Sequence, residues 1–301
     1  MSAVYTLTLN PALDYVVRAE RFEPGKINRT TGESISPGGK GINVSLVLRE
    51  FGVESCALGF VAGFTGEEIL REVASRGVAC DFVRVAGTSR INVKVRAGEE
   101  TDINAGGPSV SEEDVAALEA KVRALPAGSL LVLAGSVPAS LSKEVYGRLT
   151  EAAGEGVRVV VDAQGDALRS AVARGVWLVK PNIEELGELF GVRVEERAQV
   201  DACAAELRRM GAQNVLVSMG VRGALLYAED GQVHFVAAPA GAGIDSVGAG
   251  DSLLAGFLAA KLSGESDREA LRRGVAAGTA TAFRLGLMRY ADYEKTLPSV
   301  E

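Results

Sequence analysis

The sequence predicts an α/β fold in which a mainly parallel sheet is covered by helices on both faces. Short runs rich in β-branched and apolar residues alternate with longer runs in which apolar residues recur at helical spacing. This alternation indicates parallel strands, because each crossover between them needs a helix. The chain has 301 residues and is 47% hydrophobic, so it can bury a large core. No repeat or linker is visible, and we expect one domain over residues 1–301.

The expected elements follow this alternation along the chain. Strands are expected at the short apolar runs 4–9, 55–61, 129–134, 157–161, 176–179 and 215–218. Helices are expected at 41–51, 67–76, 111–123, 143–153, 183–190, 202–210, 252–262 and 275–283. Ligands of such sheets bind at the carboxyl ends of the strands, so we expect the functional site in the loops that enter the helices.

Two stretches break the alternation, at residues 14–36 and 90–105. Both are polar but strand-like, with apolar and polar residues alternating in segments such as Ile91 to Val95. They predict a small accessory β-sheet beside the main domain. Such a sheet has one face to hide, either over an active site as a lid or against a second subunit. Extra hairpins that cover the edge of the core are an open alternative.

Composition and charge exclude several classes of protein. The net charge is -7, from 39 acidic and 32 basic residues, and no basic run is interleaved with aromatics, so nucleic acid is not an expected partner. No segment approaches 18 uncharged apolar residues, and the N-terminal residues do not resemble a signal peptide, so no membrane association is expected. The three cysteines are far apart and odd in number, which favours reduced thiols and a cytoplasmic location. The single histidine, His234, stands in a strand pattern, so a zinc site is not expected.

The run Gly248-Ala249-Gly250-Asp251 is the strongest chemical signal in the chain, because an apolar helical stretch follows it. Glycines at a helix start let backbone N–H groups converge on one point, where the helix dipole also favours an anion. A carboxylate in the same turn is placed to accept the proton of a hydroxyl that attacks a bound phosphate. The motif therefore indicates phosphoryl transfer to an alcohol. A tight turn, with Asp251 only complementing the dipole, is the alternative.

Other nucleotide-binding motifs are missing from the sequence. The segment Gly38-Gly39-Lys40-Gly41 has a lysine among glycines but lacks the hydroxyl residue of a P-loop. No complete G-x-G-x-x-G follows a strand in the first strand–helix–strand unit, which argues against a dinucleotide fold. The glycine turn at residues 248–250 is therefore the best candidate for a nucleotide cradle.

Taken in order, the motifs resemble those of the ribokinase-like (PfkB) carbohydrate kinases over essentially the whole chain. The segments that carry the resemblance are 6–14 (TLTLNPALD), 37–44 (PGGKGINV), 90–94 (RINVK), 135–138 (GSVP), 179–185 (VKPNIEE), 217–224 (VSMGVRGA) and 246–252 (SVGAGDS). Within the family, 90–94 and 101–104 (TDIN) are most similar to the bacterial 1-phosphofructokinases. The resemblance implies a three-layer α/β/α fold whose mainly parallel central sheet carries a small β-sheet lid.

The resemblance also implies roles for individual residues. Asp251 would be the catalytic base, and the N–H groups of Gly248, Ala249 and Gly250 would stabilise charge on the transferred phosphoryl group. Sugar hydroxyls would be bound by Asp14, Gly39 and Asn43. A phosphate already on the sugar would meet Arg90, Lys40, Ser136 and, across from a neighbouring subunit, Lys26, with Lys94 a further candidate.

On the nucleotide side, the resemblance implies ATP-binding roles for Lys180, Asn182, Glu185, Ser218, Gly220, Gly223 and Ala277. Glu185 would organise Mg²⁺ through water. Judged from residue type alone, several of these positions have ordinary alternatives. Asp14 fits a turn at a strand end, Asn43 and Glu185 fit exposed helix positions, and Ala277 fits helix packing.

The implied reaction is transfer of the ATP γ-phosphoryl group to the 6-hydroxyl of fructose 1-phosphate, giving fructose 1,6-bisphosphate and ADP. The expected partners are thus a phosphorylated ketohexose, Mg²⁺ and ATP, with a homodimer formed through the lid sheet. Alternatives in the same family are a tagatose-6-phosphate kinase and a 6-phosphofructokinase. An alternative of another class is a non-catalytic sugar-phosphate sensor.

Overall fold

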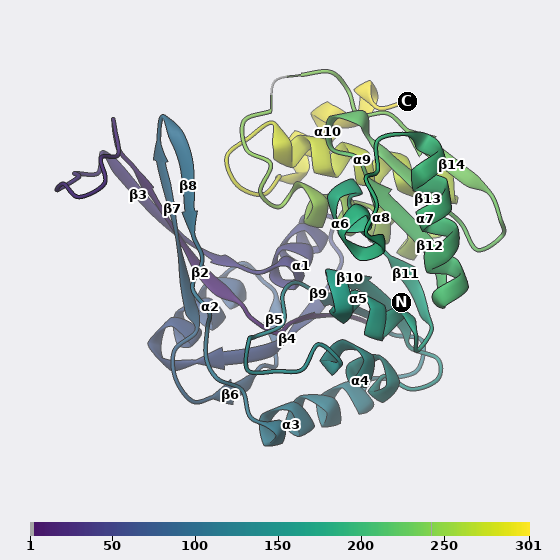
Figure 1. The fold of residues 1–301 in the computed structure, drawn as a ribbon, viewed down its shortest axis with the longest axis horizontal. Coiled ribbons are helices and arrows are strands. Elements are labelled where there is room, and N and C mark those ends of the chain that lie inside the picture. Colours follow the sequence, from purple (N-terminus) through teal and green to yellow (C-terminus); the bar gives the residue numbers. More distant parts are fainter. Residues whose placement is uncertain (1–2, 242) are drawn as a thin grey trace.

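The structure is a computed structural model that describes residues 3–241 and 243–301. The strands of its main sheet are β1 (Val4–Thr8), β4 (Ser55–Ala62), β5 (Ala79–Cys80), β6 (Val83–Val85), β9 (Leu130–Ala134), β10 (Arg158–Asp162), β11 (Val176–Val179), β12 (Ala212–Ser218), β13 (Ala224–Tyr227) and β14 (Val233–Val236). Their order is β14-β13-β12-β11-β10-β9-β1-β4-β5, with β6 beside β4 (Figure 1). Among the described strands of this sheet, only the β12–β13 and β13–β14 pairs are antiparallel, so the predicted mainly parallel sheet is confirmed.

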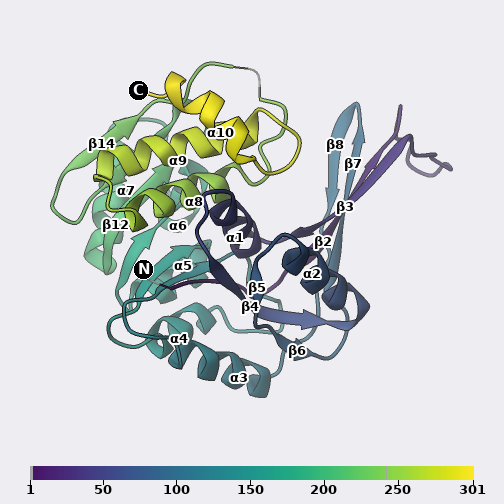
Figure 2. The same cartoon turned by 180° about the vertical axis from the view of Figure 1, so that it is seen from behind.

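Helices cover both faces of this sheet. They are α1 (Lys40–Glu50), α2 (Gly63–Ser75), α3 (Glu112–Arg123), α4 (Val145–Ala152), α5 (Gly165–Val172), α6 (Ile183–Phe190), α7 (Arg197–Met210), α8 (Ala249–Leu262), α9 (Asp267–Ala282) and α10 (Tyr290–Thr296). Figure 2, seen from behind, shows α1, α8 and α9 on the face opposite to α3–α7. The expected three-layer α/β/α arrangement is therefore present.

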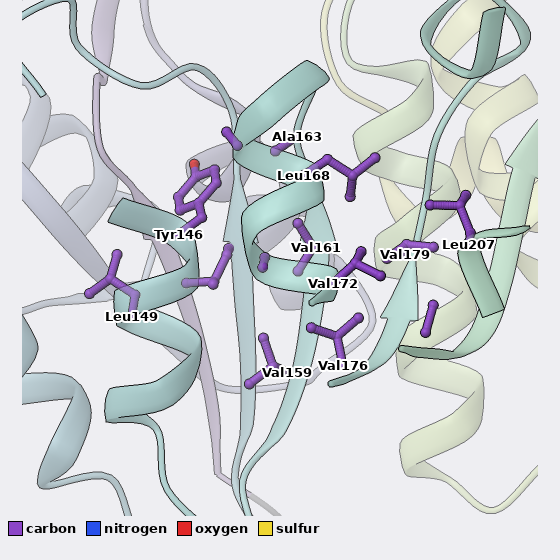
Figure 3. Close-up of a cluster of buried hydrophobic side chains, with 14 of the residues drawn as sticks. Tyr146, Leu149, Val159, Val161, Ala163, Leu168, Val172, Val176, Val179 and Leu207 are labelled. Carbon is purple, nitrogen blue, oxygen red and sulfur yellow. The ribbon is translucent and has the colours of Figure 1, made fainter. Parts of the chain in front are cut away.

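The alternation of side chains along each strand divides the core in two. In β9, Leu131 and Leu133 pack with α3–α7, whereas Leu130 and Val132 pack with α1, α8 and α9. All four side chains are at most 1% exposed. Figure 3 shows the first cluster, where side chains of α4, α5 and α7 meet those of β10 and β11. A central strand buried on both faces is what the continuous apolar runs predict.

A second, four-stranded sheet stands beside the main domain. It consists of β2 (Ala12–Arg18), β3 (Gly32–Gly38), β7 (Arg90–Ala97) and β8 (Glu99–Ile103), in the order β3-β2-β7-β8. These strands fall within or next to the two segments expected to form an accessory sheet, and Figure 1 shows them projecting from the main domain. We call this sheet the lid.

Some elements differ from the prediction. Helix α5 was not expected, although its apolar residues Ala167, Leu168, Ala171 and Val172 recur at helical spacing. Helix α7 begins at Arg197 rather than at residue 202, since its first turn is polar and held by a capping box between Glu196 and Gln199. Among the described residues, no helix is long and apolar enough to span a membrane.

Candidate active site

A cavity of about 1730 Å³ opens between the lid and the carboxyl ends of the main-sheet strands. Residues at the ends of β1, β9, β10, β11 and β12, or in the loops just after them, line or underlie it, as expected for an open α/β sheet. The lid contributes Asp14, Arg90, Asn92 and Glu100 to the lining. The cavity is larger than a typical site for one small ligand, so it has room for two substrates side by side.

Asp251 lies in the first turn of α8 and is 6% exposed. Gly248 precedes this helix with a φ of 79°, a left-handed conformation that glycine adopts without strain. Asn43 of α1 donates a hydrogen bond of 2.8 Å from Nδ2 to Oδ2 of Asp251. Burial, with repulsion from Asp162, raises the pKa of Asp251 to about 6 against the opposing effect of Asn43 and two lysines. An oriented carboxylate with this pKa is suited to act as a general base.

A buried carboxylate that none of the sequence motifs contains lies between two lysines that line the cavity. Asp162 ends β10 and is fully buried. Lys40 Nζ lies 2.7 Å from its Oδ1, and Lys180 Nζ lies 3.0 Å from its Oδ2. Although burial favours the neutral form, the two lysines hold the pKa of Asp162 below its usual value. The available signal was its position directly after an expected strand, at the carboxyl edge where ligands bind.

Glu185 is held in place at the start of α6. Asn182 and Glu185 form a capping box, in which each side chain accepts a hydrogen bond from the backbone N–H of the other. Glu185 Oε1 also accepts a hydrogen bond of 2.8 Å from Gln164 and lies 3.4 Å from Lys40 Nζ. Glu185 is only 5% exposed, so it is not the solvent-facing helix residue that its residue type alone allowed.

Lys40 therefore contacts two carboxylates, those of Asp162 and Glu185. Burial lowers its pKa, but attraction by Asp162 and Glu185 outweighs this, and the pKa is raised above its usual value. The side chain remains 33% exposed and lines the cavity. Its charge is thus shared between a buried acidic pair and the cavity, rather than being wholly available to a substrate phosphate.

The lid end of the cavity is built around Asp14. Asn92 Nδ2 donates to Asp14 Oδ1 over 2.9 Å, and Lys94 Nζ lies 3.0 Å from Asp14 Oδ2. Arg90 is anchored through Nε to the backbone carbonyl of Asn10, at 3.0 Å, and lines the same cavity. Burial lowers the pKa of Arg90, but a guanidinium stays charged at neutral pH.

The structure brings most of the predicted site residues together. Those that line the cavity are Asp14, Gly39, Lys40, Asn43, Arg90, Ser136, Lys180, Asn182, Glu185, Ser218, Gly220, Gly223, Gly248, Ala249, Gly250 and Asp251. Three candidate residues, Lys26, Lys94 and Ala277, lie outside it. Lys26 is 70% exposed and pairs with Glu23 in the loop between β2 and β3. Ala277 is fully buried, and a Cβ added to Gly256 of α8 would lie 2.8 Å from its side chain.

Ala277 is thus a helix-packing residue, which was the alternative open at this position. Its neighbours Gly278 and Thr279 line the cavity instead. The physical reason is the 100° rotation per residue of a helix, which turns a position one residue away onto another face. Among the described residues, no group of three or more acidic, histidine or cysteine side chains is arranged to hold a metal ion directly.

The fold and the site together define a phosphotransferase. A glycine turn opens a helix N-terminus to an anion, a buried carboxylate is placed beside it, and Lys40 and Lys180 line the same cavity. A polar lid sheet closes one end of a cavity that has room for a nucleotide and a second ligand. This combination is characteristic of the ribokinase-like kinases.

The chain belongs to the pfkB family of carbohydrate kinases, whose family model matches residues 5–292. The 1-phosphofructokinase of Bacillus subtilis strain 168 is 43% identical over 299 residues, which cover 99% of this chain and 98% of that protein. The D-tagatose-1-phosphate kinase of Bacillus licheniformis is 35% identical and covers 99% and 98%, respectively. The solved structure of phosphofructokinase-2 from Escherichia coli in complex with fructose 6-phosphate is 32% identical, with a TM-score of 0.92 and coverage of 99% of each chain.

Proposed function

We propose that the protein transfers the γ-phosphoryl group of ATP to the 6-hydroxyl of fructose 1-phosphate, giving fructose 1,6-bisphosphate and ADP. The observation that carries this proposal is Asp251, a buried carboxylate at the N-terminus of α8 that is oriented by Asn43 in the same cavity as Arg90. The choice of fructose 1-phosphate is supported by the 43% identity to the Bacillus subtilis enzyme of that name.

In this mechanism Asp251 accepts the proton of the attacking hydroxyl. The N–H groups of Gly248, Ala249 and Gly250 stabilise the charge on the transferred group, because the N-terminus of α8 is exposed to the cavity there. Lys180 adds positive charge at the same place: a Cβ on Gly250 would lie 3.3 Å from its Nζ. Closure of the lid excludes water and so limits hydrolysis of ATP.

Ligand recognition is divided between the two ends of the cavity. Asp14, Gly39 and Asn43 bind the sugar hydroxyls, while Arg90 and Ser136 bind the phosphate already on the sugar. Lys40 contributes charge between the two ends. ATP lies along the loops that contain Lys180, Asn182, Ser218, Gly220 and Gly223.

The donor set near the nucleotide fits Mg²⁺ held through water. Glu185 is a hard oxygen donor, and its Oε2 accepts only the Asn182 N–H among the described residues, which leaves a lone pair for a water of the hydrated ion. Its Oε1 already accepts from Gln164, so we do not place the ion in direct contact with it. When bound, Mg²⁺ would neutralise charge on the β- and γ-phosphates.

We further propose a homodimer formed through the lid. Ile35, Ile91 and Ile103 are 56%, 38% and 57% exposed, and the strand registers place them on the lid face opposite to Asp14 and Asn92. Exposed apolar side chains gathered on one face of a small sheet need a partner. In a dimer of this kind, the exposed Lys26 would reach the substrate phosphate of the neighbouring subunit. A cytoplasmic location stays a prediction from the free cysteines.

A second candidate substrate is D-tagatose 1-phosphate, because a kinase named for it is 35% identical over nearly the whole chain. The test is release of ADP by the purified protein with Mg-ATP and, in parallel, fructose 1-phosphate, tagatose 1-phosphate, fructose 6-phosphate and tagatose 6-phosphate. We expect the highest kcat/KM with fructose 1-phosphate. Preference for another sugar phosphate would overturn fructose 1-phosphate as the proposed substrate. Absence of turnover on all four would favour a sugar-phosphate sensor.

A further inference from the structure

Strand β7 turns a row of polar side chains toward the cavity side of the lid. Arg90, Asn92, Lys94 and Arg96 alternate with apolar residues, so they share one face of the strand. Asn92 and Lys94 are only 7% and 9% exposed. A buried amide and a buried ammonium are costly unless they are paired, so their partners show what they are for.

Asn92 and Lys94 both contact the carboxylate of Asp14. Strands β2 and β7 pair in parallel with Asp14 opposite Asn92, and this register brings Asn92 Nδ2 within 2.9 Å of Asp14 Oδ1. Lys94, two residues further on, places Nζ 3.0 Å from Asp14 Oδ2. On another side a Cβ added to Gly38 would lie 2.7 Å from Asp14 Oδ2, so a larger residue there would displace the carboxylate from this position. Asn92 and Lys94 together form what we call the Asp14 clamp.

The clamp leaves one buried polar atom of Asn92, its Oδ1, without a hydrogen-bond partner among the described residues. The orientation of the amide is nevertheless fixed, because an ionised carboxylate only accepts hydrogen bonds and the NH₂ group must face it. The Asn92 side chain thus donates a hydrogen bond to Asp14 while its own buried Oδ1 is left without a partner among the described residues.

Lys94 affects the cavity indirectly, through its contact with Asp14. Asp14, Arg90 and Asn92 line the cavity, but Lys94 does not. Its charge therefore reaches a ligand through Asp14, and this differs from the direct phosphate contact considered for it from the sequence. Without a cation behind it, the Asp14 carboxylate would repel a ligand that carries a phosphate.

We propose that Asn92 and Lys94 are positioning residues for sugar-phosphate recognition. They hold the Asp14 carboxylate in one orientation and offset its charge, so that its remaining lone pairs accept hydrogen bonds from hydroxyls of a phosphorylated ketohexose. This inference rests on the proposed function and adds a specificity element to the same site.

The test compares Lys94→Met with Arg96→Met. Arg96 lies on the same face of β7 with a side chain 18% exposed, but it pairs with Asp102 at 2.8 Å and Glu100 at 3.5 Å rather than with Asp14. We expect Lys94→Met to raise the KM for the sugar phosphate roughly tenfold to a hundredfold, with kcat and the KM for ATP within about threefold of wild type. Arg96→Met should leave all three within about threefold. Equal effects of the two variants would overturn the inference, since both would then only weaken the lid.

A double-mutant cycle tests the route through Asp14. If Lys94 acts on the ligand through Asp14, the loss caused by Asp14→Asn will be several-fold smaller in a Lys94→Met background than in the wild type. If the fold-losses of the two single variants multiply to give the loss of the double variant, the inference is overturned. Asn92→Ala replaces Lys94→Met in the cycle if the latter folds poorly. Calorimetric binding of fructose 1-phosphate gives the same comparison without turnover, so a wild type that binds but does not react overturns the proposed function alone.

Discussion

Asn43 and Asp251 are 208 residues apart in the sequence, yet Asn43 Nδ2 donates a hydrogen bond of 2.8 Å to Asp251 Oδ2. The bond joins the first turn of α1 to the first turn of α8. It orients a carboxylate whose pKa burial raises to about 6. The proposed base is therefore positioned by α1, and its pKa is set largely by its burial at the start of α8.

Replacement of Asp251 tests the base. Asp251→Asn keeps the shape of the side chain and an oxygen for Asn43, but it cannot accept a proton. We expect turnover to fall by roughly two to four orders of magnitude while the KM values change less than about threefold. Steady-state ADP release measures both. Asp166→Asn is the matched control, because Asp166 is an exposed carboxylate that lines the same cavity, and unchanged turnover in Asp251→Asn would remove Asp251 from the mechanism.

The raised pKa of Asp251 predicts an acid limb in the pH profile of turnover. A base with a pKa of about 6 is protonated below that pH, so kcat should fall as the pH drops through about 6. Asn43 stabilises the ionised form, and Asn43→Ala should therefore move the limb to higher pH by up to about one unit. The phosphate of the substrate also titrates in this range, but equally for both proteins. A limb at the same pH in wild type and variant would contradict the role of Asn43.

Asp162 is predicted to be a stability hot spot. Asp162→Asn leaves Lys40 and Lys180 close together without the buried charge that pairs them, and breaking a buried ion pair costs about 3–5 kcal/mol. We expect a loss of this size in the free energy of unfolding, measured by urea denaturation. Asp81→Asn removes an exposed pair with Lys121 and should cost under about 1 kcal/mol. Similar losses in both variants would mean that the buried ion pairs of Asp162 contribute no more to the free energy of unfolding than the exposed pair of Asp81.

The outer face of the lid predicts the oligomeric state. Ile35→Glu places a charge on the exposed apolar face of the lid, and we expect it to convert a dimer into a monomer in light-scattering measurements. Phe64→Glu changes another exposed apolar residue, 74% exposed at the start of α2, and should leave the dimer intact. A wild-type monomer at micromolar concentration would contradict the proposed dimer.

Local patterns predicted much of the fold because they depend on neighbouring residues. The apolar run at 176–179 and the helical spacing at 183–190 coincide with β11 and α6, since a strand or helix that faces a core repeats its apolar residues at a fixed period. Helix α5 has the same length as α6 and a comparable apolar spacing, and it was nevertheless missed; in the structure it packs mainly against α4.

Within the site, the sequence by itself determined which chemical groups stand at the ends of the strands: the glycine turn with Asp251, the cap of Asn182 with Glu185, and the polar alternation of β7. Only the tertiary structure decided which of these groups pair. Lys40 and Asp162 are 122 residues apart, and Lys94 lies behind Asp14 rather than in the cavity. Such pairs depend on strand order and register, and these are set by packing between distant segments, which a local period does not encode.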